Sequence, residues 1–359
     1  MIERMLAIYK TVGRAHGMWL APIGSGIGFL VLRAVVFFSM LLDNLRPGLA
    51  SQKVDRPIMI IGPPRTGTTF LQRYLCELGA GEGMPVWRMM FASPTLQFFI
   101  KPILPILDAV SPVRHHATVA HKTSLVSIEA SDAALMLRYL DGFFLYSFFL
   151  AFSDDDYGDF IDPEVRDTSE RDFGWLRSIW RRDLHAQGAD RVVAKLFSGA
   201  ARVGPLLKAF PDAKLIYTVR DPLNVVPSTL SLVTGVLDSA FGFWSKPEAV
   251  RTRYIERVYA QLVKLSRRFH RDYTSGSIPK DRLFLMRFDR MMSELEVVLP
   301  ELYAFMEVEM SDEVMAQIVA KAEKQRQYKS KHGYDLAKFG LSEERIRSDF
   351  DFVYESFLS

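Results

Sequence analysis

A short stretch near the start of the chain limits the fold more than any other: RPIMIIGPPRTGTTFLQRYL, residues 56–75. The apolar run 58–61 predicts a buried strand that ends at a glycine, and the apolar residues beyond the loop recur at helical spacing. This order follows the layout of the phosphate-binding loop GxxxxGK[ST]. The lysine of that pattern is absent, because Thr68 follows Gly67 and the cation of the loop is Arg65. The stretch therefore predicts an anion site at the start of a helix, without the group that usually holds a triphosphate.

Composition restricts the class of protein. The chain has 359 residues, of which 49% are hydrophobic and 24% charged, so it can bury a large core as one large domain or two small ones. A formal net charge of +3 is too small for a general nucleic-acid binder. The single cysteine, Cys76, excludes an internal disulfide and a cysteine metal cluster, and it favours a reducing compartment, the cytoplasm. We expect Cys76 to pack in the core.

The N-terminal segment is unusually apolar. From Trp19 to Leu42 it is long enough to span a bilayer, but Arg33 lies close to its centre. We favour a helix that lies on a membrane surface or packs on the enzyme, and a spanning anchor stays open as the alternative. The predicted organisation is an apolar helical segment over residues 1–50 and a main domain over 51–359. If the helix lies on a membrane, we expect the inner face of the cell membrane.

The rest of the chain alternates strands and helices. A proline-interrupted segment, 84–116, is expected to fold over a site. The patterns predict helices over 129–152, 173–185 and 204–210, and strands over 191–195 and 214–219. Such alternation indicates an α/β fold with a P-loop-like parallel sheet flanked by helices, preceded by the apolar N-terminal helix.

A second stretch, FPDAKLIYTVRDPLNVVPSTLSL at 210–232, pairs with the first. A strand ends at Arg220, Pro222 stops it, and a helix carrying Ser228 follows. Ligands of open α/β sheets bind at the C-terminal ends of the strands, so an arginine there and a serine two turns on suit a second phosphate. The alternative is that Arg220 pairs with a neighbouring carboxylate and Ser228 caps a bend.

Together these two stretches resemble the sulfotransferases that use 3′-phosphoadenosine 5′-phosphosulfate (PAPS). The family's PRxGTT loop corresponds to residues 64–69, and its RDP…S element to Arg220, Asp221, Pro222 and Ser228. HGYDLAKFGLSEERI, residues 332–346, is similar to the family's C-terminal loop, and Glu129 lies in a segment similar to its acidic one. The resemblance extends over residues 56–355 and implies that the main domain is a sulfotransferase domain.

The resemblance implies how the donor is bound. The 3′-phosphate is expected on Arg220 and Ser228, and the spent donor leaves as adenosine 3′,5′-bisphosphate. No metal is required. The 5′ end is expected at the helix start, on Arg65, Thr66, Gly67, Thr68 and Thr69. The backbone N–H groups of these residues, the hydroxyls of Thr68 and Thr69 and the guanidinium of Arg65 would bind it.

The catalytic residues are less strongly indicated. By resemblance Glu129 is our first choice for the base that takes the acceptor's proton, followed by His116 and His121. The alternatives are a glutamate that only begins a helix and histidines that are only solvated. Lys195 resembles the family's strand-end lysine, which would reach the transferring group. Here Leu-Phe-Ser-Gly follows it where the family often has Ser-Pro and a nearby histidine, so a structural ion pair is the alternative.

For the acceptor, the sequence offers only the evidence of its composition. An aromatic content of 12% and the apolar N-terminus favour a small hydrophobic alcohol or amine, or a lipid, over a polysaccharide, although the same aromatics could simply form the core. Two other classes stay open. A P-loop kinase or NTPase would need the missing lysine, although Asp221 could imitate a metal-holding carboxylate. An inactive membrane-associated scaffold would need damaged anion sites. The sequence predicts no oligomeric state.

Overall fold

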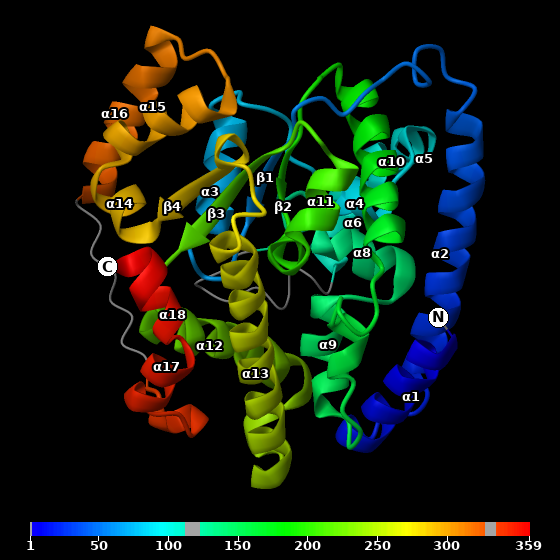
Figure 1. Ribbon diagram of the computed structural model, residues 1–359. Helices are drawn as coiled ribbons and strands as arrows, with labels where there is room; N and C mark the ends of the chain where they lie inside the picture. The colour runs from blue at the N-terminus through cyan, green and yellow to red at the C-terminus, as the bar shows by residue number, and fades with distance from the viewer. Residues whose placement is uncertain (1, 112–122, 327–334) are drawn as a thin grey trace. The chain divides into compact units, whose positions relative to one another are not determined.

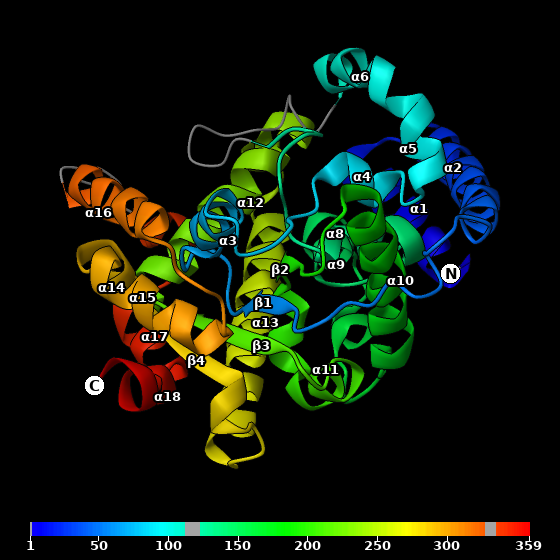
Figure 2. The same cartoon turned by 90° about the horizontal axis from the view of Figure 1, so that it is seen from above.

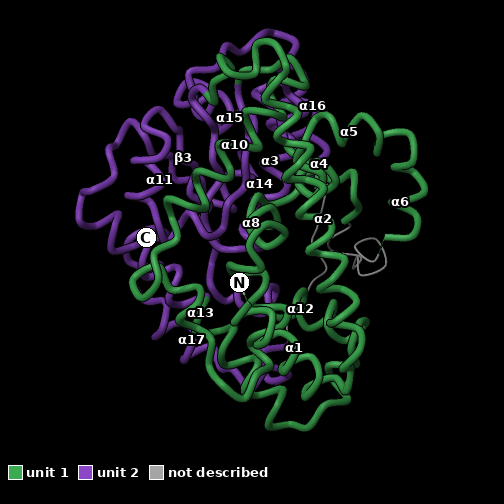
Figure 3. The backbone as a smooth tube through the Cα atoms, turned by 90° about the vertical axis from the view of Figure 1, so that its right-hand side faces the viewer, with its two compact units in different colours: residues 1–54, 84–190, 230–261 green, residues 55–83, 191–229, 262–359 purple. Residues whose placement is uncertain are grey.

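The computed structural model describes residues 2–111, 123–326 and 335–359 (Figure 1). It divides into two compact units, each made of three chain segments (Figure 3). Unit 1 comprises residues 1–54, 84–190 and 230–261, and unit 2 comprises residues 55–83, 191–229 and 262–359. The predicted division into 1–50 and 51–359 stays a proposal. Both motif stretches lie in unit 2 up to Thr229, so this unit holds the candidate site.

Unit 2 is built on a parallel four-stranded sheet in the order β2-β1-β3-β4, which confirms the predicted fold class. Its strands are β1 (Ile58–Ile61), β2 (Val193–Lys195), β3 (Lys214–Val219) and β4 (Leu283–Arg287). In the register of the sheet, Ile58 pairs with Val193 on one side and with Lys214 on the other. Every residue of β1, β2 and β3 is buried, as their continuous apolar runs predict for strands covered on both faces.

Side chains that alternate along the strands reach two different layers of helices. On one face Ile60, Ile216 and Met286 pack in a core cluster with the helices after β1 and β4. On the other face Tyr217 stacks on Phe269, with ring centroids 3.4 Å apart. The sheet of unit 2 is therefore the middle layer of three. Cys76 packs against the first of these clusters, as predicted.

Helices of unit 2 follow each strand. Two long helices, α12 (Pro222–Phe241) and α13 (Glu248–Thr274), run from one unit into the other. The helices wholly within unit 2 are α3 (Thr68–Glu77), η4 (Phe197–Ala201), α11 (Val203–Ala209), η6 (Lys280–Arg282), α14 (Phe288–Ser293), α15 (Leu295–Met306), α16 (Asp312–Arg326), η7 (Ala337–Phe339), α17 (Glu343–Asp349), α18 (Asp351–Val353) and η8 (Tyr354–Leu358).

The regular elements described in unit 1 are all helices, joined by loops and one isolated bridge between Pro85 and Ile128. By length and composition α2 is the one helix in the described part of the chain that could cross a membrane, which is weak evidence that it does. The elements of unit 1 are α1 (Ile2–His16), α2 (Ala21–Asp43), α4 (Val86–Met90), α5 (Pro94–Ile100), η1 (Lys101–Ile103), α6 (Leu104–Val110), α8 (Asp132–Tyr139), α9 (Phe143–Phe148), η2 (Leu150–Phe152), η3 (Gly158–Ile161), α10 (Ser169–Gln187) and η5 (Phe243–Ser245).

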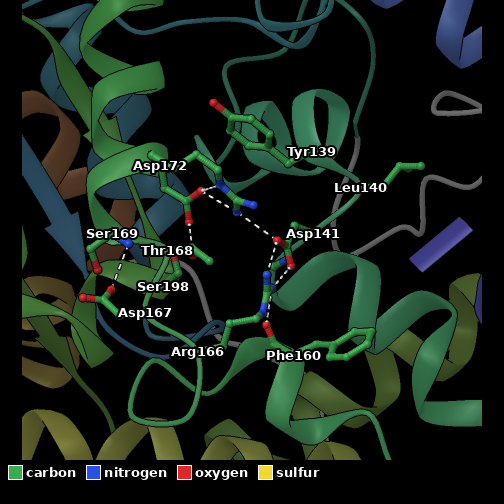
Figure 4. A network of polar contacts seen from close by, with 12 residues as sticks. Tyr139, Leu140, Asp141, Phe160, Arg166, Asp167, Thr168, Ser169, Asp172 and Ser198 are labelled. Carbon is green, nitrogen blue, oxygen red and sulfur yellow. Dashed lines mark hydrogen bonds and ion pairs between the residues drawn. The ribbon is translucent and has the colours of Figure 1, made fainter. Parts of the chain in front are cut away.

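The predicted single helix over 129–152 is wrong. It is broken between α8 and α9, where Leu140 has φ +47° and Gly142 has φ +91°. Between them Asp141 is 3% exposed and forms ion pairs with three arginines, of which Figure 4 labels Arg166. They are Arg4, Arg166 and Arg171, at 3.6, 2.5 and 2.8 Å. Because a buried carboxylate needs such partners, the chain turns to bring Asp141 to them and the helix ends.

Candidate functional site

The loop after β1 is held against β3 by a glycine and two threonines. Gly62 has φ +129°, and a Cβ there would lie 2.9 Å from the Thr218 hydroxyl and 3.0 Å from the Thr218 carbonyl oxygen. Thr66 donates to the Pro63 carbonyl oxygen at 2.7 Å and shares a 2.5 Å hydrogen bond with the Thr218 hydroxyl. Both hydrogen bonds of the Thr66 hydroxyl are therefore made within the protein, and Thr66 would bind an anion through its backbone N–H.

The loop ends where α3 begins. Gly67 caps the helix with φ +87° and no side-chain hydrogen bond, and the first intrahelical bond joins the Leu71 N–H to the Gly67 carbonyl oxygen. The N–H groups ahead of that bond have no partner within the helix and carry the positive end of its dipole. The φ of +87° favours a glycine at this position, because side chains rarely adopt it, and a Cβ there would also lie 2.3 Å from Met291 Cε, the flexible end of a side chain of α14 that would have to shift. This backbone is suited to an anionic group.

Lys195 ends β2 beside this helix start. Its side chain is 1% exposed, and Nζ donates to the Thr69 hydroxyl at 2.8 Å. Thr69 lies in the first turn of α3, so the ammonium is close to the backbone N–H groups described above. The structure thus brings the predicted strand-end lysine to the predicted loop, and its catalytic role stays a prediction.

Arg220 and Ser228 are joined to the same loop through Arg65. Arg220 Nη1 donates to the Arg65 carbonyl oxygen at 2.9 Å, and the Arg220 guanidinium lies 4.1 Å from the centre of the Phe288 ring. Arg65 Nε donates to the hydroxyl of Ser228, which is 2% exposed, at 2.8 Å. Arg65 itself has φ +68°, a left-handed conformation that costs about 1–2 kcal/mol for a side chain of this kind. Its two contacts hold it in this conformation.

Asp221, next to Arg220, is engaged in structural contacts. Its Oδ1 accepts the Leu223 N–H at 2.9 Å and the Tyr354 hydroxyl at 2.7 Å. Burial, followed by the hydrogen bond to Asp221, raises the pKa of Tyr354 well above its usual value, so the hydroxyl is protonated and donates. The C-terminal helices are thereby fastened to the end of β3. Beside them a mainly apolar recess is bordered by Pro63, Arg220, Phe350 and Val353.

Most of the predicted binding residues meet at one edge of the sheet. Because the strands are parallel, the loop after β1, Lys195, Arg220 and Phe288 all lie at their C-terminal ends. Glu129 lies in unit 1, just before α8, and its role stays a prediction. His116 and His121 lie outside the described residues, as do residues 332–334 of the predicted C-terminal loop. Within the described ranges no three His, Cys, Asp or Glu side chains are grouped as metal ligands would be, and the metal-free expectation stays a prediction.

Three residues of this site were not predicted. Phe288 follows β4, whose apolar run LFLM between charged residues could have been recognised as a strand. Thr218 belongs to a predicted strand, but its partner across the sheet is not visible in the sequence. Tyr354 contacts Asp221 from far along the chain, and no local pattern indicates it.

The fold is that of a sulfotransferase. Residues 57–312 match the sulfotransferase family, and the chain therefore belongs to that family. Solved structures give the same fold: sulfotransferase STF1 from Mycobacterium tuberculosis H37Rv has a TM-score of 0.67 and 17% identity, over 97% of this chain and 90% of that one. Sulfotransferase STF9 from Mycobacterium avium has a TM-score of 0.66 and 20% identity, over 89% and 81% of the two chains.

A curated relative has a more specific name. Omega-hydroxy-beta-dihydromenaquinone-9 sulfotransferase Stf3 of Mycobacterium bovis is 27% identical over 182 residues, and so is the protein of the same name from Mycobacterium tuberculosis. The aligned stretch covers 50% of this chain and 45% of each relative, so the chain matches about half of their length. The family resemblance inferred from the two motif stretches is confirmed.

Proposed function

We propose that this sulfotransferase takes its sulfuryl group from PAPS. The observation that carries the proposal is the series of contacts from Arg220 to Arg65 to Ser228, which joins the two motif stretches into one anion-binding surface. Two phosphate subsites that share side chains suit a nucleotide phosphorylated at both ends of its ribose. A triphosphate site would place its charges along one line over the loop.

Each residue has a distinct part in binding such a donor. The backbone N–H groups at the start of α3, with Thr68 and Thr69, would hold the 5′-phosphate end, and Arg220 and Ser228 the 3′-phosphate. PAPS supplies a sulfuryl group already activated on its 5′-phosphate. Lys195, held on the Thr69 hydroxyl, is positioned to stabilise negative charge that moves onto the leaving phosphate. Arg65 lies on the proposed 3′ side, because its side chain is bonded to Ser228.

A kinase or NTPase is disfavoured by two observations. The loop lacks the lysine that binds β- and γ-phosphates. The carboxylate that could have imitated a metal ligand, Asp221, accepts hydrogen bonds from Tyr354 and from the Leu223 N–H. An inactive scaffold is disfavoured because residues 64–69, Arg220 and Ser228 keep the motif without a damaged position.

For the acceptor we propose a hydroxyl or amine on an apolar, lipid-like molecule. The name of the Mycobacterium bovis relative gives an ω-hydroxylated menaquinone derivative as its acceptor. The aromatic content of 12% in this chain agrees with an apolar acceptor. Glu129 is our proposed base for the acceptor's proton. We further propose that the enzyme works in the cytoplasm at the inner face of the membrane, with α2 lying on the bilayer.

Ligand-dependent thermal unfolding tests the donor. Adenosine 3′,5′-bisphosphate should raise the unfolding temperature without added metal, because at a hundredfold excess over Kd a ligand stabilises the native state by about 2.7 kcal/mol. Adenosine 5′-monophosphate, which lacks the 3′-phosphate, is the matched control and should give a much smaller shift. A larger shift with ATP and magnesium than with the bisphosphate would refute the proposal and favour a kinase.

Sulfation with a labelled donor tests the acceptor. The protein should transfer label to a long-chain isoprenoid alcohol and release the bisphosphate in equal amount. A polysaccharide of similar hydroxyl content is the control and should stay unlabelled. Equal labelling of both would contradict an apolar acceptor while leaving the donor proposal intact.

A further inference from the structure

The outward face of α2 is apolar along its length. Its inward stripe, Val36, Met40 and Asp43, is buried at helical spacing. Outward residues are largely exposed: Leu20 at 82%, Phe38 at 64% and others above 40%, which are Ile23, Ile27, Leu30, Val31, Val35, Phe37, Leu41 and Leu42. A helix on the surface of a globular protein normally carries polar residues on its outer side. This face therefore needs a cover that the described residues of unit 1 do not supply.

A second segment of unit 1 also exposes apolar side chains. From Pro94 to Val110, α5, η1 and α6 follow one another, and α5 lies beside α2 in Figure 2. Four of their apolar side chains are about two-thirds exposed or more: Phe98, Phe99, Ile106 and Val110. Exposed apolar patches mark interaction sites for proteins or membranes. Both segments belong to unit 1, and α2 packs on α5, so we consider their apolar side chains together.

A buried carboxylate fixes the two segments to each other. Asp43, the last residue of α2, is fully buried and accepts the Thr95 N–H of α5 at 3.0 Å. It also forms ion pairs with Arg46 at 3.4 Å and with Arg182 of α10 at 3.6 Å. Arg46 in turn donates to the Thr95 hydroxyl at 3.2 Å. The end of α2 and the start of α5 therefore hold a set orientation, and their apolar sides cannot move independently.

We propose that α2 and the α5–α6 segment form one membrane-docking face that lies on a bilayer containing anionic phospholipids. The inference deepens the membrane location given under the proposed function and rests on it. From Leu20 to Leu42 the polar side chains are Ser25, Arg33 and Ser39, and the stretch has no Asp or Glu. Protein interfaces carry about one hydrogen bond per 100–200 Å², whereas hydrocarbon requires none. A face so poor in hydrogen-bonding groups suits lipid better than a second protein.

Charge supports the same occupant. Lys101 is exposed at the junction of α5 and η1, between the apolar residues Phe99 and Ile103. Lys10 is exposed on α1, next to α2 in the chain. A basic residue among apolar ones places its ammonium at the level of the headgroups while the apolar side chains enter the acyl region. The complementary surface is therefore one with an apolar interior and anionic headgroups at its boundary with water.

The helix lies on the bilayer and does not span it, because both of its ends are fastened to unit 1. At the first end a Cβ on Gly13 of α1 would lie 2.4 Å from the ring of Trp19, so α1 is packed directly on this ring. Arg4 of α1 donates to the Leu140 carbonyl oxygen at 2.7 Å, which holds α1 itself. At the other end Asp43 is paired with Arg182. Lipid can therefore reach one side of α2, and protein occupies the other.

Vesicle co-sedimentation of the full chain tests the proposal. The wild type should bind vesicles of mixed phosphatidylcholine and phosphatidylglycerol more strongly than vesicles of phosphatidylcholine alone. The double substitution Phe98→Ser, Phe99→Ser should reduce the bound fraction at least tenfold, because two exposed rings no longer enter the acyl region. Val165 and Val297 are exposed apolar residues outside the face, and substituting both by serine is the matched control, which should bind as the wild type does.

The charge contribution has its own pair of variants. Lys101→Glu should weaken binding to the mixed vesicles at least about fivefold, the factor expected for one basic residue near an anionic surface, and leave binding to phosphatidylcholine unchanged. Lys280 also begins an exposed 3-10 helix, η6, and Lys280→Glu should bind like the wild type. Equal binding of the wild type to both kinds of vesicle would overturn the anionic part of the proposal.

Two further results would overturn the docking face. One is unchanged vesicle binding by the Phe98, Phe99 variant. The other is a wild type that does not bind vesicles and is dimeric in size-exclusion chromatography, together with a double variant that is monomeric. This result would mean that a second copy of the chain covers the face. The bisphosphate-induced thermal shift is measured on every variant. It should be retained in all of them, so a failure of the docking face is distinguishable from a failure of the donor assignment.

Discussion

Substituting Gly62 by alanine should damage the donor loop more than any other single methyl group. The φ of +129° is one that side chains rarely adopt, and strain of this kind costs about 1–3 kcal/mol. The added Cβ would also lie 3.0 Å from the carbonyl oxygen and 3.2 Å from the backbone nitrogen of Thr218. These atoms belong to β3, an inner strand paired on both sides, and cannot withdraw. If the shared hydrogen bond between Thr66 and Thr218 is also lost, about 1 kcal/mol is added. We expect a total loss of about 2–4 kcal/mol in the free energy of unfolding.

Gly79 provides the matched control. It lies just beyond α3 with φ +77°, and a Cβ there would meet nothing within 4 Å. Gly79→Ala should therefore cost about 1 kcal/mol, from backbone strain alone. Urea unfolding gives the two free energies, and titration with adenosine 3′,5′-bisphosphate gives the affinities. Gly62→Ala should bind at least tenfold more weakly, and Gly79→Ala should bind normally. Equal destabilisation by the two substitutions would refute the argument that contact with β3 fixes the loop.

Three further predictions address separate parts of the chain. Arg220→Ala should weaken binding of the bisphosphate about tenfold to a hundredfold, because one charge-assisted hydrogen bond is lost, and the affinity for adenosine 5′-monophosphate should hardly change. The control in the same titration is Arg290→Ala, which removes an exposed arginine paired with Glu301. Glu129→Gln should reduce turnover about a hundredfold with bisphosphate affinity unchanged, and normal turnover by this variant in a sulfation assay would exclude Glu129 as the base. Burial, and then the nearby Lys246, lowers the pKa of His16 to about 4, so below pH 6.5 the unfolded chain binds a proton that the folded chain does not bind until about pH 4. The free energy of unfolding should therefore fall from pH 6.5 to pH 4, by about 1–2 kcal/mol once solvent screening of the half-buried ring is included, and pH-dependent urea unfolding of His16→Phe should lack this fall.

Local patterns predicted the parts of the fold that depend on few neighbours. The run Ile58–Ile61 before a glycine and the run Lys214–Val219 before Arg220 were predicted with the bounds that the structure has. Both are fully buried strands, for which a continuous apolar run bounded by turn residues is the expected signal. The helix after the first loop was predicted for the same reason, since its apolar residues repeat at helical spacing.

Features that depend on distant residues could not be read from the sequence. The break at Leu140 results from Asp141, whose buried charge requires Arg4, Arg166 and Arg171 from three other places in the chain. The aromatic run after it, considered alone, favours a continuous helix.

The candidate site was predicted to a similar extent. Arg65, Arg220 and Ser228 were all proposed as anion-binding residues, and the structure brings them together. The contact between Arg65 and Ser228 depends on the side-chain rotamer and the backbone φ of Arg65. No residue pattern in the sequence indicates either of these. The contribution of Phe288 depends on β4 lying beside β3, so it requires the strand order as well as the strands.

The strand order also dictates when the donor loop can become ordered during synthesis. The first strand made, β1, occupies an inner position, and its neighbours β2 and β3 begin only at Val193 and Lys214. Until both have left the ribosome, at least one edge of β1 lacks its partner strand, and pairing across so long a separation is slow. A nascent chain that stops before Thr218 therefore leaves β1 without the full length of β3 beside it and has no Thr218 to bond with Thr66. Such truncated products are expected to aggregate or to be held by chaperones, and the anion site is one of the later parts of this protein to form.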